Sequence, residues 1–465
     1  MTKIKFGTDG WRAIIAQEYT TDNVARVAYA TALWIKERGD NHTAVVGHDC
    51  RFGGRLFTEV TISVLISQGI KVYTSENFVS TPMVSLSSLN HNAYAGIVIT
   101  ASHNPPSYNG YKIKAHYGGP AIQSEIDAVE AKIPDTYEYV THPFAELMKS
   151  DMVEIIDMEQ EYIDHVYANF DIEGIRKSGI KLGYDAMYGA GMNVVRRLLP
   201  EATLLHADYN PSFMGQAPEP IARNLKPFSQ LIASSDIDCG LATDGDADRI
   251  GLFNAKGEFV DSHHIILLLI RYLVEYKGET GCVYSSFSCT SKIKNLCDHY
   301  GIENQVTKIG FKYICKEMIE NQSLLGGEES GGIAVSTHIP ERDGIWMGLI
   351  IWEYMAKAGK SLDELIQEIY DMIGSFAMDR YDLRMPEEQK LSIIEKCKKG
   401  DYASFGEYDV NGRETIDGYK FVLSDDSWVM IRPSGTEPLL RVYAQAATAE
   451  ETTAILDATK ATILA

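Results

Sequence analysis

The sequence lacks long apolar runs and is poor in positive charge. The purely apolar stretch near its middle, residues 265–270, is far too short to span the ~30 Å hydrocarbon layer of a bilayer. Lys and Arg number 43 against 64 Asp and Glu, which gives a formal net charge of −21, and such a field repels the phosphates of nucleic acids. We therefore expect neither a membrane-spanning nor a nucleic-acid-binding protein.

Cysteine pairs, an export signal and low-complexity segments are also missing. The seven cysteines form no CxxC pair, and an odd number does not suit a disulfide framework, so we expect reduced thiols and no zinc site. The first residues contain no apolar segment of signal-peptide length, which indicates a cytoplasmic protein. What remains is an ordinary globular composition, 45% hydrophobic and 23% charged over 465 residues, enough for about three or four domains.

Helical and strand-like segments alternate through most of the chain. Apolar residues recur at helical spacing over 22–39, and a strand-like run covers residues 95–100. Further along, the pattern predicts a helix over 311–319 and an amphipathic helix after Gly344. From about Phe376 strand-like segments outnumber helices. The predicted fold class is α/β, with three α/β domains over 1–145, 146–249 and 250–373 and a C-terminal α+β domain over 374–465.

Polar loops follow the strand-like segments, where binding groups gather in open α/β sheets. In the loop TASHNP, residues 100–105, Ser102 precedes His103 in a turn fixed by prolines. Ser102 is a candidate nucleophile or phosphate carrier, although a turn capped by Ser and Asn side chains explains the same pattern. There is no GxSxG elbow, which argues against an acyl-transfer triad. Lys112 is close enough in sequence to return to this loop.

The loop DGDADR, residues 244–249, carries three carboxylates at alternating positions. In an extended turn they can converge on one hard cation such as Mg²⁺, and three like charges held together without a cation are costly. A solvated acidic turn is the alternative. The sixth position is Arg249 rather than the glycine of an EF-hand, and a guanidinium beside the metal suits a phosphate ligand.

Two later loops could bind a sugar phosphate. GGEESGG, residues 326–332, offers acceptors to paired sugar hydroxyls. RPSGTEP, residues 432–438, combines a guanidinium, two hydroxyls and glycine-exposed N–H groups, which together make an anion nest. Each loop, taken alone, also fits an ordinary surface turn. With one polar loop in each of four domains, a cleft between the domains is the expected site.

All four loops in this order, together with FGTDGWR at residues 6–12, closely resemble the α-D-phosphohexomutase family of phosphoglucomutases, phosphomannomutases and phosphohexosamine mutases. The similarity covers essentially the whole chain. It implies a heart-shaped four-domain enzyme in which Ser102 carries a phosphoryl group and exchanges it with a hexose monophosphate through a bound 1,6-bisphosphate. The expected partners are hexose phosphates, the expected cofactors are Mg²⁺ and glucose 1,6-bisphosphate, and the chain is expected to act as a monomer or homodimer.

The resemblance also assigns roles to individual residues. The metal ligands it implies are Ser102, Asp244, Asp246 and Asp248. The catalytic residues it implies are Ser102, His103, Arg12, Lys112, Lys308 and Arg249. The substrate-binding residues it implies are Glu328, Ser330, Arg432, Ser434, Gly435, Thr436 and Arg441. For proton transfer we favour Lys308 or His103, because the pKa of an arginine, above about 12, makes Arg12 a poor base.

The choice of sugar is a separate question. GEES at 327–330 looks most like the glucose branch, since hexosamine mutases tend to carry Gln at the position of Glu329 and dual mannose/glucose enzymes a Met. A mutase for mannose or glucosamine phosphates, a phosphatase or bisphosphate synthase, and a noncatalytic sugar-phosphate sensor are the alternatives. Gly332 departs from many bacterial mannose/glucose enzymes, which have a histidine there; His338 is a candidate replacement.

Overall fold

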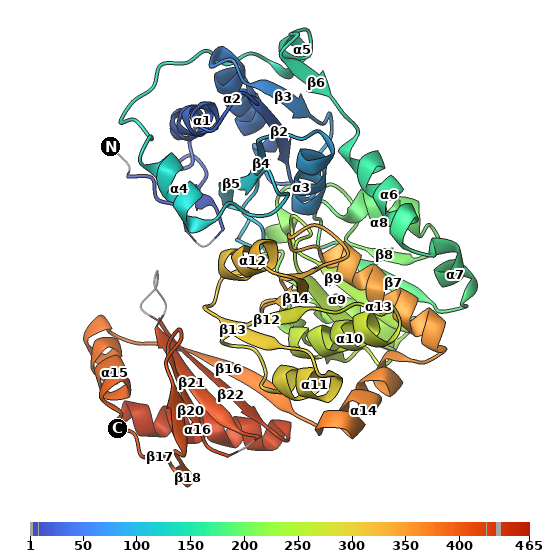
Figure 1. Cartoon of the computed structure of the whole chain (residues 1–465), viewed down its shortest axis with the longest axis vertical. Helices are drawn as coiled ribbons and strands as arrows, with labels where there is room; N and C mark the ends of the chain where they lie inside the picture. Colours follow the sequence, from blue (N-terminus) through green and yellow to red (C-terminus); the bar gives the residue numbers. More distant parts are fainter. Residues whose placement is uncertain (1–2, 8, 425, 434–438) are drawn as a thin grey trace. The chain divides into compact units, whose positions relative to one another are not determined.

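The chain forms two compact units, seen in the computed structural model of Figure 1. The structure describes residues 3–7, 9–424, 426–433 and 439–465. The first unit consists of Met1–Cys282 with Gly310–Glu364, and the second of Val283–Ile309 with Leu365–Ala465. Among the described residues, no helix is both long enough and apolar enough to cross a membrane.

The first unit opens with a six-stranded sheet in the order β1-β5-β4-β2-β3-β6. Strands β4, β2, β3 and β6 run parallel to one another, whereas β5 is antiparallel to both β4 and β1. Helices α1 and α2 cover one face and α3 lies on the other (Figure 1). The elements are β1 (Trp11–Ile14), α1 (Thr21–Lys36), β2 (Thr43–His48), α2 (Gly54–Ser67), β3 (Lys71–Thr74), α3 (Thr81–Asn90), β4 (Ala95–Ile99), β5 (Tyr108–Ala115), α4 (Gln123–Glu130), α5 (Phe144–Leu147) and β6 (Val153–Ile155).

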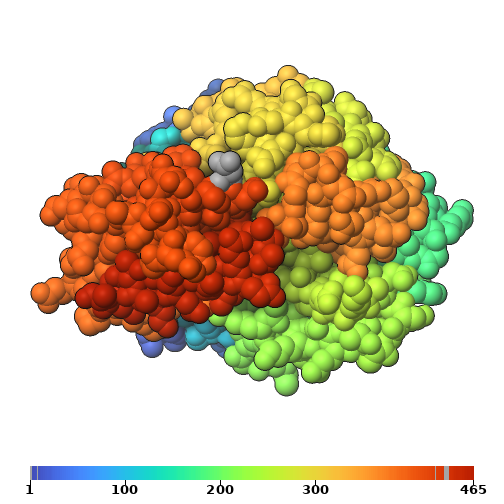
Figure 2. All heavy atoms as spheres, turned by 90° about the horizontal axis from the view of Figure 1, so that it is seen from below, coloured from blue at the N-terminus to red at the C-terminus, as the bar shows by residue number. Residues whose placement is uncertain are grey.

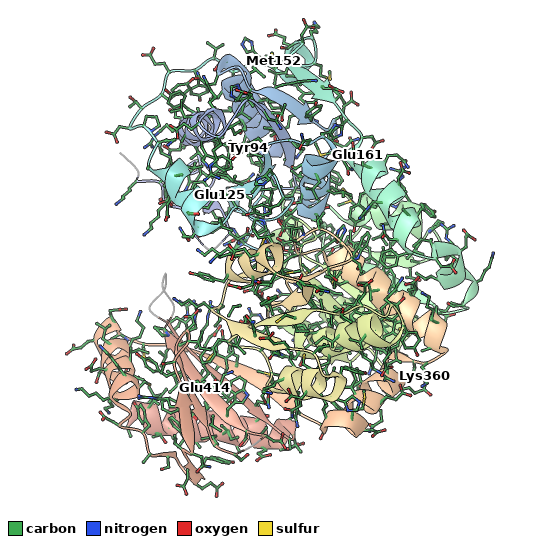
Figure 3. All side chains as sticks on the ribbon, viewed as in Figure 1. Tyr94, Glu125, Met152, Glu161, Lys360 and Glu414 are labelled. Carbon is green, nitrogen blue, oxygen red and sulfur yellow. The ribbon has the colours of Figure 1, made fainter. Side chains whose placement is uncertain are left out.

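A second sheet in the same unit has the order β11-β10-β9-β7-β8, parallel between β8, β7 and β9 and antiparallel from there to β11. Its elements are α6 (Met158–Asn169), α7 (Ile172–Lys177), β7 (Leu182–Asp185), α8 (Met192–Leu198), β8 (Thr203–Leu205), α9 (Lys226–Ala233), β9 (Cys239–Thr243), β10 (Ile250–Asn254) and β11 (Phe259–Val260). Glu161 of α6, labelled in Figure 3, joins the two sheets' helices because it accepts hydrogen bonds from Ser87 and Asn90 of α3.

The rest of the first unit supplies an antiparallel strand pair and three helices. They are α10 (Ser262–Glu275), α12 (Phe311–Glu320), β14 (Ser323–Gly327), β15 (Ile333–Val335) and α13 (Gly344–Ala358). The helix predicted over 311–319 is confirmed as α12. The helix predicted after Gly344 is present as α13, but the prediction that it is amphipathic is wrong. Every residue of α13 from Gly344 to Met355 is buried, because α7, α10, β9 and β10 enclose the helix.

The second unit contains a parallel strand pair and an antiparallel sheet in the order β16-β22-β21-β20-β19. Helices α15 and α16 share one apolar core with this sheet, and Figure 2 shows the closely packed side chains of this region in orange-red to red. The elements are β12 (Cys282–Ser286), α11 (Lys292–Tyr300), β13 (Asn304–Thr307), α14 (Leu362–Ile373), β16 (Ala377–Arg384), α15 (Glu387–Lys399), β17 (Ser404–Phe405), β18 (Tyr408–Asp409), β19 (Gly412–Glu414), β20 (Tyr419–Val422), β21 (Trp428–Pro433), β22 (Leu439–Ala446) and α16 (Ala449–Leu464).

Candidate active site

Ser102 lies in the loop that joins β4 to β5. Its side chain is buried, and its backbone has a φ of 52°, the left-handed region that L-residues other than Asn and Asp seldom adopt. The backbone N–H of Ser102 donates to Oγ1 of Thr100 at 2.9 Å. Its hydroxyl donates to Oδ2 of Asp244 at 2.6 Å. The turn therefore directs the serine oxygen at the acidic loop predicted from the sequence.

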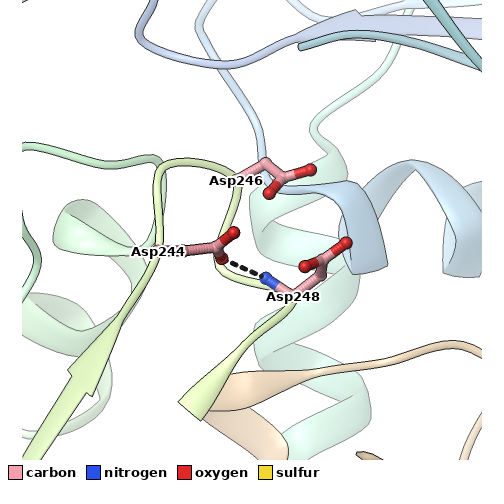
Figure 4. Close-up of side chains that lie close together, drawn as sticks. All are labelled: Asp244, Asp246 and Asp248. Carbon is pink, nitrogen blue, oxygen red and sulfur yellow. Dashed lines mark hydrogen bonds between the residues drawn. The ribbon is translucent and has the colours of Figure 1, made fainter. Parts of the chain in front are cut away.

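That acidic loop joins β9 to β10, and its three aspartates face one another (Figure 4). One carboxylate oxygen from each of Asp244, Asp246 and Asp248 lies within 4.8 Å of the others, and all three residues are buried. Oδ1 of Asp244 accepts the backbone N–H groups of Asp248 and Arg249 at 3.0 and 3.1 Å. Burial, together with the charges of Asp246 and Asp248, raises the pKa of Asp244 well above its usual value.

The oxygens of this loop fit a hard cation. Oδ2 of Asp246 accepts from Lys112 and Thr81, and Oδ2 of Asp248 lies 2.8 Å from both Lys112 and Arg342. The second oxygens, Oδ1 of Asp246 and Oδ1 of Asp248, are buried and have no hydrogen-bond partner among the described residues. Buried carboxylate oxygens need a partner, and Mg²⁺ prefers oxygen ligands. Within the described part of the chain, this is the one cluster of acidic, histidine or cysteine side chains with metal-binding spacing.

Lys112 of β5 reaches the same cluster. Its ammonium lies 2.8 Å from a carboxylate oxygen of each of Asp9, Asp246 and Asp248. Although burial favours the neutral amine, these three carboxylates raise the pKa of Lys112 far above its usual value. The side chain is therefore a fixed positive charge and cannot release a proton near neutral pH.

His103 and two arginines lie beside the serine. Nδ1 of His103 is 3.3 Å from Oγ of Ser102, and burial, followed by the charges of Arg249 and Arg12, holds the pKa of His103 well below its usual value. A neutral imidazole at this place can accept a proton. Arg12 donates to Oδ1 of Asn104 at 2.8 Å.

The GGEESGG loop meets the acidic loop in the same unit. Arg249 and Gly332 form an antiparallel bridge. Oε1 of Glu328 accepts the backbone N–H of Gly310 at 2.8 Å, and burial, with the neighbouring charge of Glu329, raises the pKa of Glu328 to about 7. Ser330, which follows on this loop, is half-buried.

The remaining predicted site residues belong to the second unit. Lys308 follows β13, and Arg432 on β21 faces Asp417 with Nε and Nη2 each 3.2 Å from a different carboxylate oxygen. Nε of Arg441 lies 4.0 Å from Asp382. Three further predicted residues lie outside the described residues, namely Ser434, Gly435 and Thr436.

Sequence reasoning missed two partners of the site, Asp9 and Arg342. Oδ2 of Asp9 lies 2.6 Å from Arg342 and 2.8 Å from Lys112, and the charges of these two side chains hold the pKa of Asp9 well below its usual value despite burial. A Cβ atom on Gly332 would lie 2.6 Å from Cδ of Arg342, so Arg342 occupies the space beside this glycine. His338 is engaged elsewhere: its ring stacks on Trp346 with 3.8 Å between centroids.

Comparisons with known proteins place the chain among its relatives. Models of phosphoglucomutase/phosphomannomutase domains I, II, III and the C-terminal domain match residues 3–140, 160–257, 261–373 and 382–461 in that order. The chain belongs to the phosphoglucomutase/phosphomannomutase family. The resemblance stated from the loops and the four-domain α/β architecture are thereby confirmed. As a member of this family the chain is an enzyme, a phosphohexomutase that transfers a phosphoryl group within its substrate.

Individual members of the phosphoglucomutase/phosphomannomutase family match over their whole length. The phosphoglucomutase/phosphomannomutase of Thermococcus kodakarensis is 30% identical over 96% of this chain and 95% of its own. The phosphoglucosamine/phosphogalactosamine mutase of Sulfurisphaera tokodaii is 28% identical over 95% of each. A crystal structure from Thermus thermophilus, named as a phosphomannomutase, superposes with a TM-score of 0.88 at 30% identity over 100% of both chains. These names differ in the sugar.

Proposed function

We propose that this phosphohexomutase interconverts glucose 1-phosphate and glucose 6-phosphate through phosphorylated Ser102. The observation that carries the proposal is the buried serine hydroxyl, which a left-handed turn directs at Asp244 within a cluster of three aspartates. Phosphoryl transfer needs positioning and neutralisation of the moving oxygens. A serine held among fixed charges in a buried site meets both needs.

The reaction consists of two transfers in opposite directions. In the first, the bond between Oγ of Ser102 and phosphorus breaks, and a bond from phosphorus to the free sugar hydroxyl forms, giving glucose 1,6-bisphosphate. The proton of that hydroxyl passes to a base, for which His103 is suited because its Nδ1 lies 3.3 Å from Oγ of Ser102. The bisphosphate then turns and returns its other phosphoryl group to Ser102, and the base returns the proton.

The remaining roles follow from charge. Asp244, Asp246 and Asp248, with the phosphorylated Ser102, would hold Mg²⁺, which when bound neutralises charge on the phosphoryl oxygens. Lys112 stays protonated and contributes a positive charge rather than a proton. Arg249 has a buried Nε without a hydrogen-bond partner in the part of the chain that the structure describes. It is suited to contact the reacting phosphate, with Arg12 as electrostatic support.

The substrate-binding roles complete the proposal. Glu328 and Ser330 would hold sugar hydroxyls in both orientations. The second unit would bind the phosphate that does not react, through Arg432, Ser434, Gly435, Thr436 and Arg441. Lys308 stays a second candidate for the base. The seven cysteines are buried and form no disulfide among the described residues, which fits a reducing compartment. We propose that the enzyme acts in the cytoplasm as a monomer or homodimer.

The choice of glucose rests on the GEES segment, 327–330. A second candidate, a phosphoglucosamine mutase, is favoured by the similarity to the Sulfurisphaera tokodaii enzyme. The test is kcat/KM for the 1-phosphates of glucose, mannose, glucosamine and N-acetylglucosamine, with Mg²⁺ and a trace of the matching 1,6-bisphosphate. A clear preference for glucose supports the proposal, and a preference for an amino sugar overturns it. Release of inorganic phosphate would identify a phosphatase instead.

A further inference from the structure

Arg51 is a buried arginine that the reaction scheme above does not use. It lies between β2 and α2, in the segment Asp49-Cys50-Arg51, and is only 1% exposed. The face of its guanidinium is covered by the ring of Phe213, 5.0 Å from the ring centroid. Burying a charged group is costly unless hydrogen bonds and a counter-charge compensate, so the partners of this side chain are informative.

The guanidinium donates to four backbone carbonyls of one short segment, residues 102–108. Nη2 donates to the carbonyls of Ser102 and Asn104, the latter at 2.7 Å. Nη1 donates to the carbonyls of Pro105 and Tyr108 at 2.9 and 3.2 Å. Three of the acceptors lie in the turn between β4 and β5 that carries the candidate nucleophile, and the fourth, Tyr108, begins β5. A planar fork with several fixed donors can satisfy such a set, whereas a single ammonium cannot.

Asp49 and Thr100 hold the same turn from its other side. Oδ2 of Asp49 lies 3.3 Å from Nε of Arg51 and accepts the hydroxyl of Thr100 at 2.5 Å. The Thr100 oxygen in turn accepts the backbone N–H of Ser102 at 2.9 Å. Both backbone polar groups of Ser102 are therefore fixed by one ion pair, the carbonyl directly and the N–H through Thr100.

The conformation that these bonds fix is an unfavourable one. Ser102 has a φ of 52°, and such backbone conformations persist only where the surrounding structure enforces them. The carbonyl of Ser102 is also closely packed on a second side, because a Cβ atom on Gly245 would lie 2.6 Å from it. A turn released from Arg51 would be free to relax, and Oγ would then leave its direction toward Asp244.

We propose that Arg51 is a positioning residue for phosphoryl transfer, whose guanidinium holds the left-handed turn at Ser102 and so aligns the serine oxygen with the acidic loop. The inference rests on the proposed phosphoserine mechanism. According to this inference, the planar guanidinium of Arg51 holds the turn through the geometry of its donors rather than through its charge. Arg51→Lys, which keeps the charge and loses the fork, is therefore the informative variant.

The experiment measures transfer to the serine directly. Wild type, Arg51→Lys and the control Arg26→Lys are mixed with ³²P-labelled glucose 1,6-bisphosphate in Mg²⁺ buffer, and label on Ser102 is followed in a single turnover. Arg26 is also buried and donates to a carbonyl, that of Pro134 at 2.7 Å, which does not belong to the Ser102 loop. For Arg51→Lys we expect the rate of label transfer to Ser102 and kcat to fall about 100-fold, and KM for glucose 1-phosphate to change less than about threefold. Arg26→Lys should transfer label at the wild-type rate per folded molecule.

The outcomes distinguish a failure of the Arg51 inference from a failure of the proposed function. Transfer by folded Arg51→Lys at the wild-type rate overturns the inference and leaves the proposed function intact, whereas a wild type that never takes up label overturns both. If Arg51→Lys does not fold, Thr100→Val tests the same turn, because it keeps the side-chain volume and removes both hydrogen bonds of Thr100. A roughly 10-fold slower transfer with unchanged KM supports the inference, and a wild-type rate refutes it.

Discussion

Replacing Lys112 by methionine should destabilise the first unit strongly in the absence of metal. The variant keeps the length of the side chain and removes an ammonium that lies 2.8 Å from three carboxylates. Asp9 and Asp248 keep Arg342 as a cationic neighbour, whereas Asp246 keeps the hydroxyl of Thr81 but no ion pair among the described residues. Removing one partner of a buried ion pair costs about 3–5 kcal/mol, because the other charge stays buried.

The assay is chemical unfolding in EDTA and in 10 mM Mg²⁺. Four of the five tryptophans belong to the first unit, so a Trp428→Phe background limits the fluorescence signal to that unit. Since Mg²⁺ would neutralise the same carboxylates, we expect the stability difference between wild type and Lys112→Met to shrink when the metal is added. A difference that Mg²⁺ leaves unchanged would refute the assignment of the metal site to the three aspartates.

A matched control separates burial from distance. Lys71 pairs with Glu154 at 2.7 Å, as close as the contacts of Lys112, but 38% of its side chain is exposed. Solvent screening makes such surface pairs weak, so Lys71→Met should unfold at the wild-type denaturant concentration. If Lys112→Met also unfolded there in EDTA, the buried charge network described above would carry no stability and the reasoning would fail.

Three further predictions follow from individual side chains. Ser102→Ala should abolish turnover while glucose 6-phosphate still binds by calorimetry; full activity would exclude the phosphoserine mechanism. Arg432→Ala should raise KM about 10- to 150-fold with little change in kcat, because a charge-assisted phosphate contact contributes roughly 1.5–3 kcal/mol, and an unchanged KM would remove the C-terminal domain from the substrate site. Burial, with a smaller effect of Arg55, lowers the pKa of His48 from 6.5 to about 4. On acidification the unfolded chain therefore takes up this proton before the folded chain does. The contribution of His48 to the free energy of unfolding is fully present above pH 6.5 and should fall by about 3 kcal/mol as the pH drops toward 4. His48→Asn should lose this part of the pH dependence in unfolding curves measured at both pH values.

The parts of the site that are local in sequence could be predicted from it. Ser102 and the aspartates of residues 244–248 stand in short loops after apolar strands, so their composition and position already indicate chemistry. The structure brings these two loops together through the hydrogen bond between Ser102 and Asp244. The resemblance to a family implied that residues of both loops bind one metal ion, whereas composition and spacing alone left both loops compatible with ordinary turns.

The parts that depend on distant residues could not be predicted. Asp9 and Arg342 are separated by 333 positions, and neither stands out in its own segment. Helix α3 is hard to predict for a different reason. Its serines at 85, 87 and 88 are buried with its apolar residues, so no face shows the periodicity of a surface helix. The same burial on all sides explains why α13 has no polar face.

The pairing of Asp9 with Arg342 has a consequence for synthesis of the protein. At about 5–20 residues per second, the ribosome needs roughly 20–70 s to add the 333 residues between them. During that time Asp9, one of the first residues made, has Arg12 as a neighbour but lacks the guanidinium of Arg342. The first unit also draws on residues up to Glu364, so its folding cannot finish while synthesis is in its first half. The candidate active site therefore cannot be completed until most of the protein exists.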